Sequence, residues 1–348
     1  MLSSGYIIDK IHFTDGVAKI DALSSARSWQ SSAEATKKID QRFTTILKAE
    51  WNHSYGETDG YKNGKYLDQF SAVMLFRYAR INKNLIITGM VRKTYHNGSE
   101  VPFIPSIQSY WKFTKALALR VAGAEVYRIP TLNDRFWQPG GNENLLPEEG
   151  EEFSTALVAE TKVNHFTFSL DAGVFYSKIN NQIVWVPGAN GLYGAENVHQ
   201  VESKGTSATF RLKYSGNKTT VNLTITPQYN ESVILKSSGT FVNAIGKQQM
   251  YTPRELLKGM LKINYRVWSV SCYYNQTGER FTTPDHNAVL PTYSTTDVVL
   301  AYEKRYRKIS LTLTFSANNI FDENYQVLAW RAMPGRNYQS GLLLGFGK

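Results

Sequence analysis

The chain has 348 residues, of which 13% are aromatic, and a formal net charge of +10 at pH 7. That length is enough for two average domains or one large β-barrel. No stretch approaches 18 uncharged apolar residues, which excludes a transmembrane helix. The mean hydropathy of −0.35 does not exclude a β-barrel, whose strands alternate lipid-facing and lumen-facing residues.

The first 40 residues are the least regular part of the chain. Residues 5–13 and 17–24 alternate weakly on either side of Asp15-Gly16, a hairpin-turn dipeptide. Residues 25–40, rich in Ser and Ala, predict a loop or a short helix. From residue 41 the alternation becomes regular. Further strands are predicted at 41–51, 67–80, 84–93, 104–113, 116–128, 150–162, 165–178, 201–214, 218–230, 255–265, 268–278, 293–304, 307–318 and 336–346.

The connections between these strands alternate between short and long. Tight turns are predicted near 81–83, 114–115, 163–164, 215–217, 266–267 and 305–306, and long polar loops at 52–66, 94–103, 129–149, 179–200, 231–254, 279–292 and 319–335. The predicted strands of ten to fourteen residues are long enough to cross a bilayer when tilted. Long loops at one end and tight turns at the other are typical of an outer-membrane barrel. We therefore predict an all-β fold: a transmembrane, antiparallel, up-and-down β-barrel of about sixteen strands.

The last strand has the face pattern of a strand in lipid. Tyr338, Ser340, Leu342, Leu344 and Phe346 share one face by alternation. The other face carries small and polar residues around Leu343.

Two motifs point to a known family. The C-terminal one contains Asn319, Phe321, Asp322, Pro334, Gly335, Arg336 and Phe346. The loop after residue 128 contains Pro130, Asn133, Gly141, Asn142, Pro147 and Glu148. Together with similar strands near 84–113 and 201–205, they resemble TonB-dependent outer-membrane receptors over residues 84–348. Glu143 and Leu146 depart from the family pattern, in which Pro and Lys are usual.

The resemblance implies that the chain is only part of a receptor. The family's barrel has twenty-two strands and is filled by an N-terminal plug domain, whereas residues 1–348 read as one partial barrel, with 1–40 poorly defined and 41–348 as regular hairpins. The first residues also show no signal-peptide pattern. A sixteen-strand piece would close at a smaller diameter, pair with a partner fragment or leave its edges open.

The resemblance further implies active uptake of a scarce metal-chelate or cobalamin-like ligand, such as a ferric siderophore, haem or cobalamin, in the outer membrane of a Gram-negative bacterium. The implied partners are outer-membrane lipid and lipopolysaccharide, the barrel assembly machinery at the C-terminal strand, and TonB through a plug domain absent from these residues. Loop aromatics and cations suit a planar or anionic ligand. The candidates are Tyr95, His96, Arg135, Trp137, Trp185, Tyr193, Arg280, Trp330 and Arg331. Each could instead belong to the interfacial girdle or contact lipopolysaccharide, and we expect Arg336 to be structural.

Other functions are left open or disfavoured. The chain could be a porin-like passive channel without a plug, or a receptor fragment without function. An enzyme is disfavoured because Glu148, Glu149, Glu151 and Glu152 are nearly consecutive and do not converge on a cleft. The single cysteine, Cys272, excludes an internal disulfide, and we expect neither a metal site nor a cofactor. Lys and Arg are scattered rather than clustered, which disfavours nucleic-acid binding.

Overall fold

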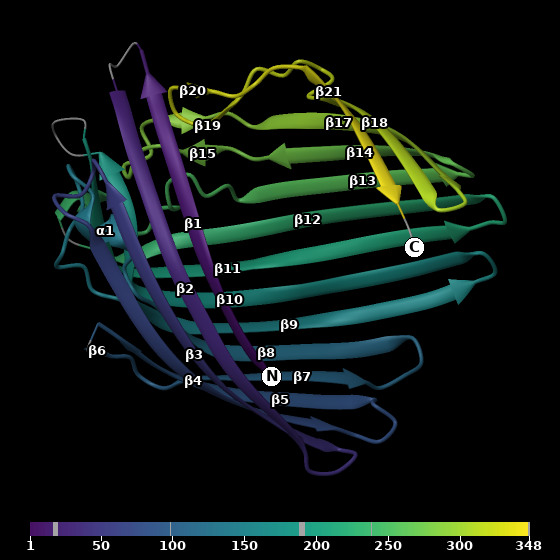
Figure 1. Ribbon diagram of the computed structural model, residues 1–348, viewed down its shortest axis with the longest axis horizontal. Coiled ribbons are helices and arrows are strands. Elements are labelled where there is room, and N and C mark those ends of the chain that lie inside the picture. Colours follow the sequence, from purple (N-terminus) through teal and green to yellow (C-terminus); the bar gives the residue numbers. More distant parts are fainter. Residues whose placement is uncertain (17–19, 98, 188–191, 238, 347–348) are drawn as a thin grey trace.

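The computed structural model describes residues 1–16, 20–97, 99–187, 192–237 and 239–346, which form one large antiparallel sheet of 17 strands. Figure 1 shows this sheet curling round to form the wall of a barrel. Its strands are β1 (Leu2–Asp15), β2 (Ile20–Lys38), β3 (Phe43–Thr58), β4 (Lys65–Ala79), β5 (Leu85–His96), β6 (Ser99–Glu100), β7 (Ile104–Lys112), β8 (Leu117–Arg128), β9 (Glu148–Val163), β10 (Phe166–Pro187), β11 (Tyr193–Ser215), β12 (Thr219–Lys236), β13 (Glu255–Tyr265), β14 (Trp268–Thr277), β17 (Tyr293–Tyr306), β18 (Ile309–Asn318) and β21 (Asn337–Phe346).

Smaller elements lie in the loops. They are two hairpins, β15 (Arg280–Phe281) with β16 (Val289–Leu290) and β19 (Gln326–Leu328) with β20 (Arg331–Ala332), and the short helices α1 (Leu132–Phe136) and η1 (Gly239–Ala244). No helix among the described residues is long and apolar enough to cross a membrane.

The sheet is a meander in which each long strand pairs with its neighbours in the chain. β14 pairs with β17 and β18 with β21, because the intervening hairpins fold out of the sheet. Within the described residues no pairing joins β1 to β21. The sheet therefore has two edges, one along each of these strands.

The predicted fold class is confirmed, since the sheet has sixteen long strands and the two-residue β6. Several boundary predictions are wrong: residues 52–58 belong to β3 and 231–236 to β12, although both were predicted as loop. Two longer segments also differ. Residues 25–38 are neither loop nor helix but the main part of β2, which pairs along its length with β1 and β3. Most of the predicted 179–200 loop belongs to β10 and β11, which run to 22 and 23 residues. Residues 17–19 of the second predicted strand and 188–191 of that loop lie outside the described residues.

The side chains of the wall alternate between an apolar outer face and a polar inner face. In β3 the outward Phe43, Leu47 and Trp51 are exposed, whereas Glu50 faces inward and pairs with Arg92 of β5 at 3.3 Å. The predicted outer face of the last strand is confirmed, because Tyr338, Leu342 and Phe346 are exposed. Such a wall is stable where lipid covers its outer surface.

Aromatic pairs mark the end of the barrel that carries the short turns. Neighbouring strands place Phe43 beside Tyr78, Phe166 beside Tyr214, and Trp268 beside Tyr302, with ring centroids 4.8 to 5.0 Å apart. Near the opposite end Phe315 stacks with Tyr338 at 6.1 Å. Two such belts are the expected positions of amphipathic rings at the membrane interfaces.

The buried apolar residues gather at the end that carries the long loops. One cluster joins Val186, Val198, Val201 and Ile234 to Ala244 of η1, and a second joins Leu145, Ile183 and Ala195. A barrel wall that faces lipid outside and polar groups inside needs no central core. Packing is instead concentrated where loops fold back onto β10, β11 and β12.

Neighbouring positions on β17 test which face meets lipid. Val298 lies on the outer face opposite Cys272, and Val299 on the inner face between Ser271 and Ser316. Val298→Arg should lower the free energy of unfolding in lipid vesicles by roughly 2–4 kcal/mol, the cost of arginine on the lipid face near mid-membrane. Val299→Arg should cost far less. Urea unfolding followed by tryptophan fluorescence measures both, and equal losses would contradict the assignment of faces.

Candidate functional site

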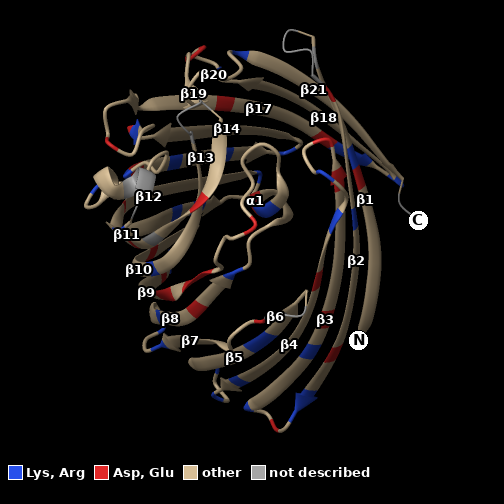
Figure 2. Ribbon diagram, turned by 90° about the vertical axis from the view of Figure 1, so that its left-hand side faces the viewer, with Lys and Arg blue, Asp and Glu red and all other residues tan. Residues whose placement is uncertain are grey.

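The loop between β8 and β9, residues 129–147, forms a segment that lies inside the long-loop end of the barrel; we call it the mouth segment. Figure 2 shows α1, its helical part, between the wall of β1 to β4 and the wall of β8 to β12. Thr131 caps the helix: its hydroxyl accepts from the Asp134 amide at 3.1 Å, and the Asp134 carboxylate accepts from the Thr131 amide at 2.9 Å. This reciprocal capping box defines where the helix begins.

Asp134 is the buried anchor of the mouth segment. Its carboxylate accepts a hydrogen bond from Trp185 Nε1 of β10 at 2.9 Å and lies 3.4 Å from Arg128 Nη1 of β8. Burial alone would raise the pKa of Asp134, but the bonds from Trp185, Thr131 and Arg128 hold it below its ordinary value. The charged carboxylate is therefore the form that the fold stabilises.

Arg128 extends this network to β9. It binds Glu148 through two nitrogens, with Nε donating to Oε2 at 2.7 Å. Glu148 also accepts from the Ile183 amide at 2.7 Å. The mouth segment is thus tied to three adjacent strands, and Glu148, which the sequence analysis identified as a motif residue, has a structural role.

The opposite side of the mouth segment reaches the loop between β3 and β4. Tyr61 donates to Asn133 and meets Trp137 edge-on, and the Gln138 amide donates to the Gly60 carbonyl at 2.6 Å. Any side chain at Gly60 would collide with the Trp137 ring, because a Cβ there would lie 2.7 Å from it. Close packing of the two loops therefore requires glycine at this position.

A third set of contacts joins the mouth segment to the start of β11. The Ala195 amide donates to the Gly140 carbonyl at 2.8 Å, and the Asn142 side chain donates to the Ala195 carbonyl at 3.3 Å. Gly140 has φ +116°, and a Cβ on it would lie 1.9 Å from the Tyr193 carbonyl oxygen. The segment is therefore fixed on both sides and bridges the interior of the barrel end.

A polar cavity of about 400 Å³ lies beneath the mouth segment. Its lining includes the inward residues Glu50, Gln69, Arg92 and Thr94, together with Leu132 of α1. Arg92 and Glu50 pair across it. The cavity below the mouth segment is therefore lined by charged side chains.

Five of the predicted ligand-binding residues lie on or around the mouth segment. They are His96, Arg135, Trp137, Trp185 and Tyr193. Arg135 lies over the ring of Phe136, and His96 Nδ1 is buried with no hydrogen-bond partner among the described residues. Trp185 is engaged by Asp134, whereas Tyr193 is half exposed.

The other four predicted residues lie elsewhere. Tyr95 is on the outer face, where Lys93 lies over its ring. Arg280 is almost fully buried between two loops. Trp330 and Arg331 are exposed at the β19–β20 hairpin, Trp330 at 95%.

The sequence analysis missed two residues near the β3–β4 connection that contact the mouth segment. Tyr61 lies in the connection and Lys65 begins β4. Tyr61 donates to Asn133, and Lys65 Nζ lies 4.4 Å from the ring centroid of Phe136. The sequence did give one indication of these residues: an aromatic and a cationic side chain within the predicted long loop 52–66. Their pairing with α1, about seventy residues later, could not be read from spacing.

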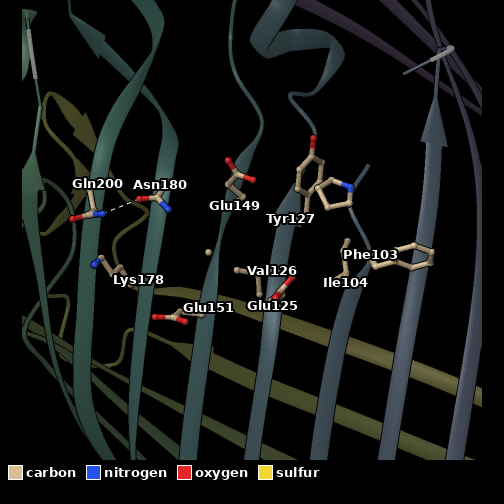
Figure 3. A pocket seen from close by; sticks show the side chains of 12 residues that line it. Phe103, Ile104, Glu125, Val126, Tyr127, Glu149, Glu151, Lys178, Asn180 and Gln200 are labelled. Carbon is tan, nitrogen blue, oxygen red and sulfur yellow. Dashed lines mark hydrogen bonds between the residues drawn. The ribbon is translucent and has the colours of Figure 1, made fainter. Parts of the chain in front are cut away.

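A second hollow, also of about 400 Å³, lies on the outer surface (Figure 3). Glu125 of β8 is directly opposite Glu151 of β9, which has Lys178 of β10 on its other side. Alternation places these side chains on the same face as the exposed Phe153. Among the described residues no group of three His, Cys, Asp or Glu could hold a metal ion, and we assign this hollow no ligand.

Comparison with known proteins identifies the family. Residues 13–320 match the family described as TonB dependent receptor-like, beta-barrel. The chain belongs to the TonB-dependent receptor β-barrel family. Proteins of this family reside in the outer membrane of Gram-negative bacteria and are transporters rather than enzymes.

Individual relatives resemble the chain over part of their length. The vitamin B12 transporter BtuB of Photobacterium profundum is 24% identical over 183 residues, which cover 46% of this chain and 29% of BtuB. The FrpB iron transporter of Neisseria meningitidis (F5-1 variant) superposes with a TM-score of 0.72 at 12% identity, covering 98% of this chain and 60% of FrpB. The siderophore receptor PirA of Acinetobacter baumannii has a TM-score of 0.66 at 14% identity, with 98% and 59% covered. The chain thus spans about three fifths of these solved receptors.

Asp134→Asn tests the anchor of the mouth segment in this TonB-dependent receptor barrel. The substitution weakens the bonds from Trp185 and Arg128, so amides of residues 131–145 should exchange hydrogen about tenfold faster at pH 7, as expected for a loss of about 1.4 kcal/mol.

The direction in which pH changes the stabilising contribution of Asp134 follows from the direction of its pKa shift. Because the pKa of Asp134 is lowered in the folded protein, its contribution is complete above the unfolded-state pKa of about 4 and is lost as pH falls through the folded value. The difference in exchange between wild type and Asp134→Asn should therefore begin to shrink below roughly pH 4 and disappear below the folded pKa of Asp134. An unchanged difference at acid pH would contradict a charged anchor.

Proposed function

We propose that this chain is the C-terminal barrel portion of a receptor that takes up a scarce ligand of the ferric siderophore, haem or cobalamin class across the outer membrane. The observation that carries this proposal is the bridged mouth: one anchored segment holds aromatic and cationic side chains above a charged cavity. A segment fixed across the opening would restrict the free passage of solutes that a passive pore provides.

The chemistry of the mouth suits a large, flat or anionic ligand. Arg135 supplies a guanidinium that binds carboxylates and other oxyanions. Trp137 and Tyr193 are partly exposed and present aromatic surface. The names of BtuB, FrpB and PirA describe transporters of vitamin B12 and iron and a receptor for siderophores, which supports the same classes of ligand here.

Transport itself would require parts outside these residues. We propose that TonB acts through a plug domain that residues 1–348 do not include, and that the barrel assembly machinery recognises β21. On this proposal the chain is one partial barrel domain whose long-loop end faces the cell exterior, with lipid and lipopolysaccharide around its outer face.

Ligand binding by the full chain in detergent micelles tests the proposal. Haemin, cyanocobalamin and a ferric catecholate are titrated separately while tryptophan fluorescence is recorded, and at least one should saturate the quenching. For an anionic ligand, Arg135→Gln should weaken binding about tenfold or more, because a charge-assisted hydrogen bond contributes about 1.5–3 kcal/mol.

Arg266→Gln is the matched control, since it removes the same charge at a short turn of the opposite end and should leave binding unchanged. If none of the three compounds binds and the chain conducts ions steadily in a planar bilayer, the passive channel is the better description.

A further inference from the structure

A small cavity lies between two loops at the long-loop end, away from the mouth segment. Its volume is about 260 Å³, and its lining includes Arg280, Leu290, Tyr293, Tyr325 and Gln326. Arg280 begins the β15–β16 hairpin, whereas Tyr325 and Gln326 belong to the loop after β18. Pockets that enclose drug-sized molecules begin at about 300 Å³, so this cavity fits a smaller molecule or one group of a larger one.

Arg280 is the unusual member of the lining because its charge is buried without a counter-ion. The residue is 3% exposed. Within the described part of the chain no carboxylate lies within the 4 Å ion-pair distance of its guanidinium. Burial lowers the pKa of Arg280, and the guanidinium lies over the ring of Tyr293, 4.8 Å from its centroid. A buried cation in this state attracts an anion.

The hydrogen bonds of Arg280 leave part of its guanidinium unused. Nη2 donates to the Pro291 carbonyl at 2.6 Å and Nη1 to the Gln326 carbonyl at 3.1 Å. These account for two of the five N–H groups of an arginine. Nε is buried and has no hydrogen-bond partner in the part of the chain that the structure describes. The unused donors are the ones that a carboxylate would accept from.

The aromatic wall of the cavity adds a preference for flat molecules. Tyr293 and Tyr325 stack with ring centroids 4.5 Å apart and planes inclined by 23°. Glu323 also lines the cavity, beyond the 4 Å ion-pair distance from the Arg280 guanidinium. Its negative charge disfavours anions, most strongly those that carry more than one negative charge. A flat monoanion meets both conditions.

We propose that this cavity binds a small, flat monocarboxylate, with the carboxylate against the guanidinium of Arg280 and the apolar body beside Tyr293 and Tyr325. The site is separate from the mouth and does not rest on the proposed uptake function. Bound there, the anion would neutralise Arg280 and strengthen the contact between the β15–β16 hairpin and the loop after β18.

Fluorine NMR of the full chain in detergent micelles tests this proposal with para-fluorobenzoate as the probe. Saturable binding is expected, and neutral para-fluorobenzyl alcohol, which has the same ring, should bind at least tenfold more weakly. Equal binding of the two compounds, or no saturable binding of the acid, would overturn the proposal.

Two variants test separately the charge of Arg280 and the open volume of the cavity. Arg280→Gln should weaken para-fluorobenzoate binding at least tenfold, and Leu290→Phe, which keeps the charge but fills the cavity, should weaken it to a similar extent. Arg307→Gln, at a short turn of the opposite end, removes one charge as well and should bind normally. Retained affinity in Leu290→Phe would exclude the cavity as the site even if Arg280→Gln failed to fold.

Discussion

Backbone hydrogen bonding is the constraint on which the rest of this structure depends. Lipid offers no partner to an amide or a carbonyl, so strands that cross it must pair with neighbours along their whole length. The meander from β1 to β21 meets this requirement for every long strand except along its two outer edges. On the proposal that the chain is a partial barrel, β1 and β21 are the strands at which further pairing would complete the wall.

The need to satisfy backbone hydrogen bonds in lipid divides the chain into two kinds of segment, the strands of the wall and the loops beyond it. Within the wall, alternation alone decides which side chains meet lipid, and polar residues such as Glu50 and Arg92 collect inside. Beyond the wall the backbone is free to turn, and stability comes from specific polar contacts. Asp134 illustrates this second regime, because one buried carboxylate joins α1 to β8 and β10. The mouth is rigid through hydrogen bonds rather than through a large apolar core.

Sequence patterns predicted the regular strands well and the strand ends poorly. β3 and β21 could be predicted because aromatic and aliphatic residues recur at alternate positions on their outer faces. β2 was missed because Ala33 packs in a row with Ala49 and Ala72, small residues whose role appears only in the pairing register. β10 and β11 were cut short because, beyond the belts, their apolar residues such as Val186 and Val198 pack against loops, a contact that strand alternation does not indicate.

The site was predictable only in part, for a related reason. The loop motif led to Glu148, and loop composition led to Arg135 and Trp137, but no pattern indicated that Tyr61 would contact Asn133. No sequence pattern indicated that Arg280 would be buried between two hairpins. Contacts between distant loops depend on strand order and register, which are properties of the whole sheet.

The most direct test of this account is the labelling of single cysteines on intact cells by a membrane-impermeant maleimide, in a Cys272→Ser background. Glu143→Cys lies in the exposed part of the mouth segment and Asn217→Cys in the short turn between β11 and β12. The account predicts that Glu143→Cys is labelled on intact cells and that Asn217→Cys is labelled only after the cells are broken open. The reverse pattern, or labelling of both on intact cells, would contradict a barrel whose mouth segment faces the exterior.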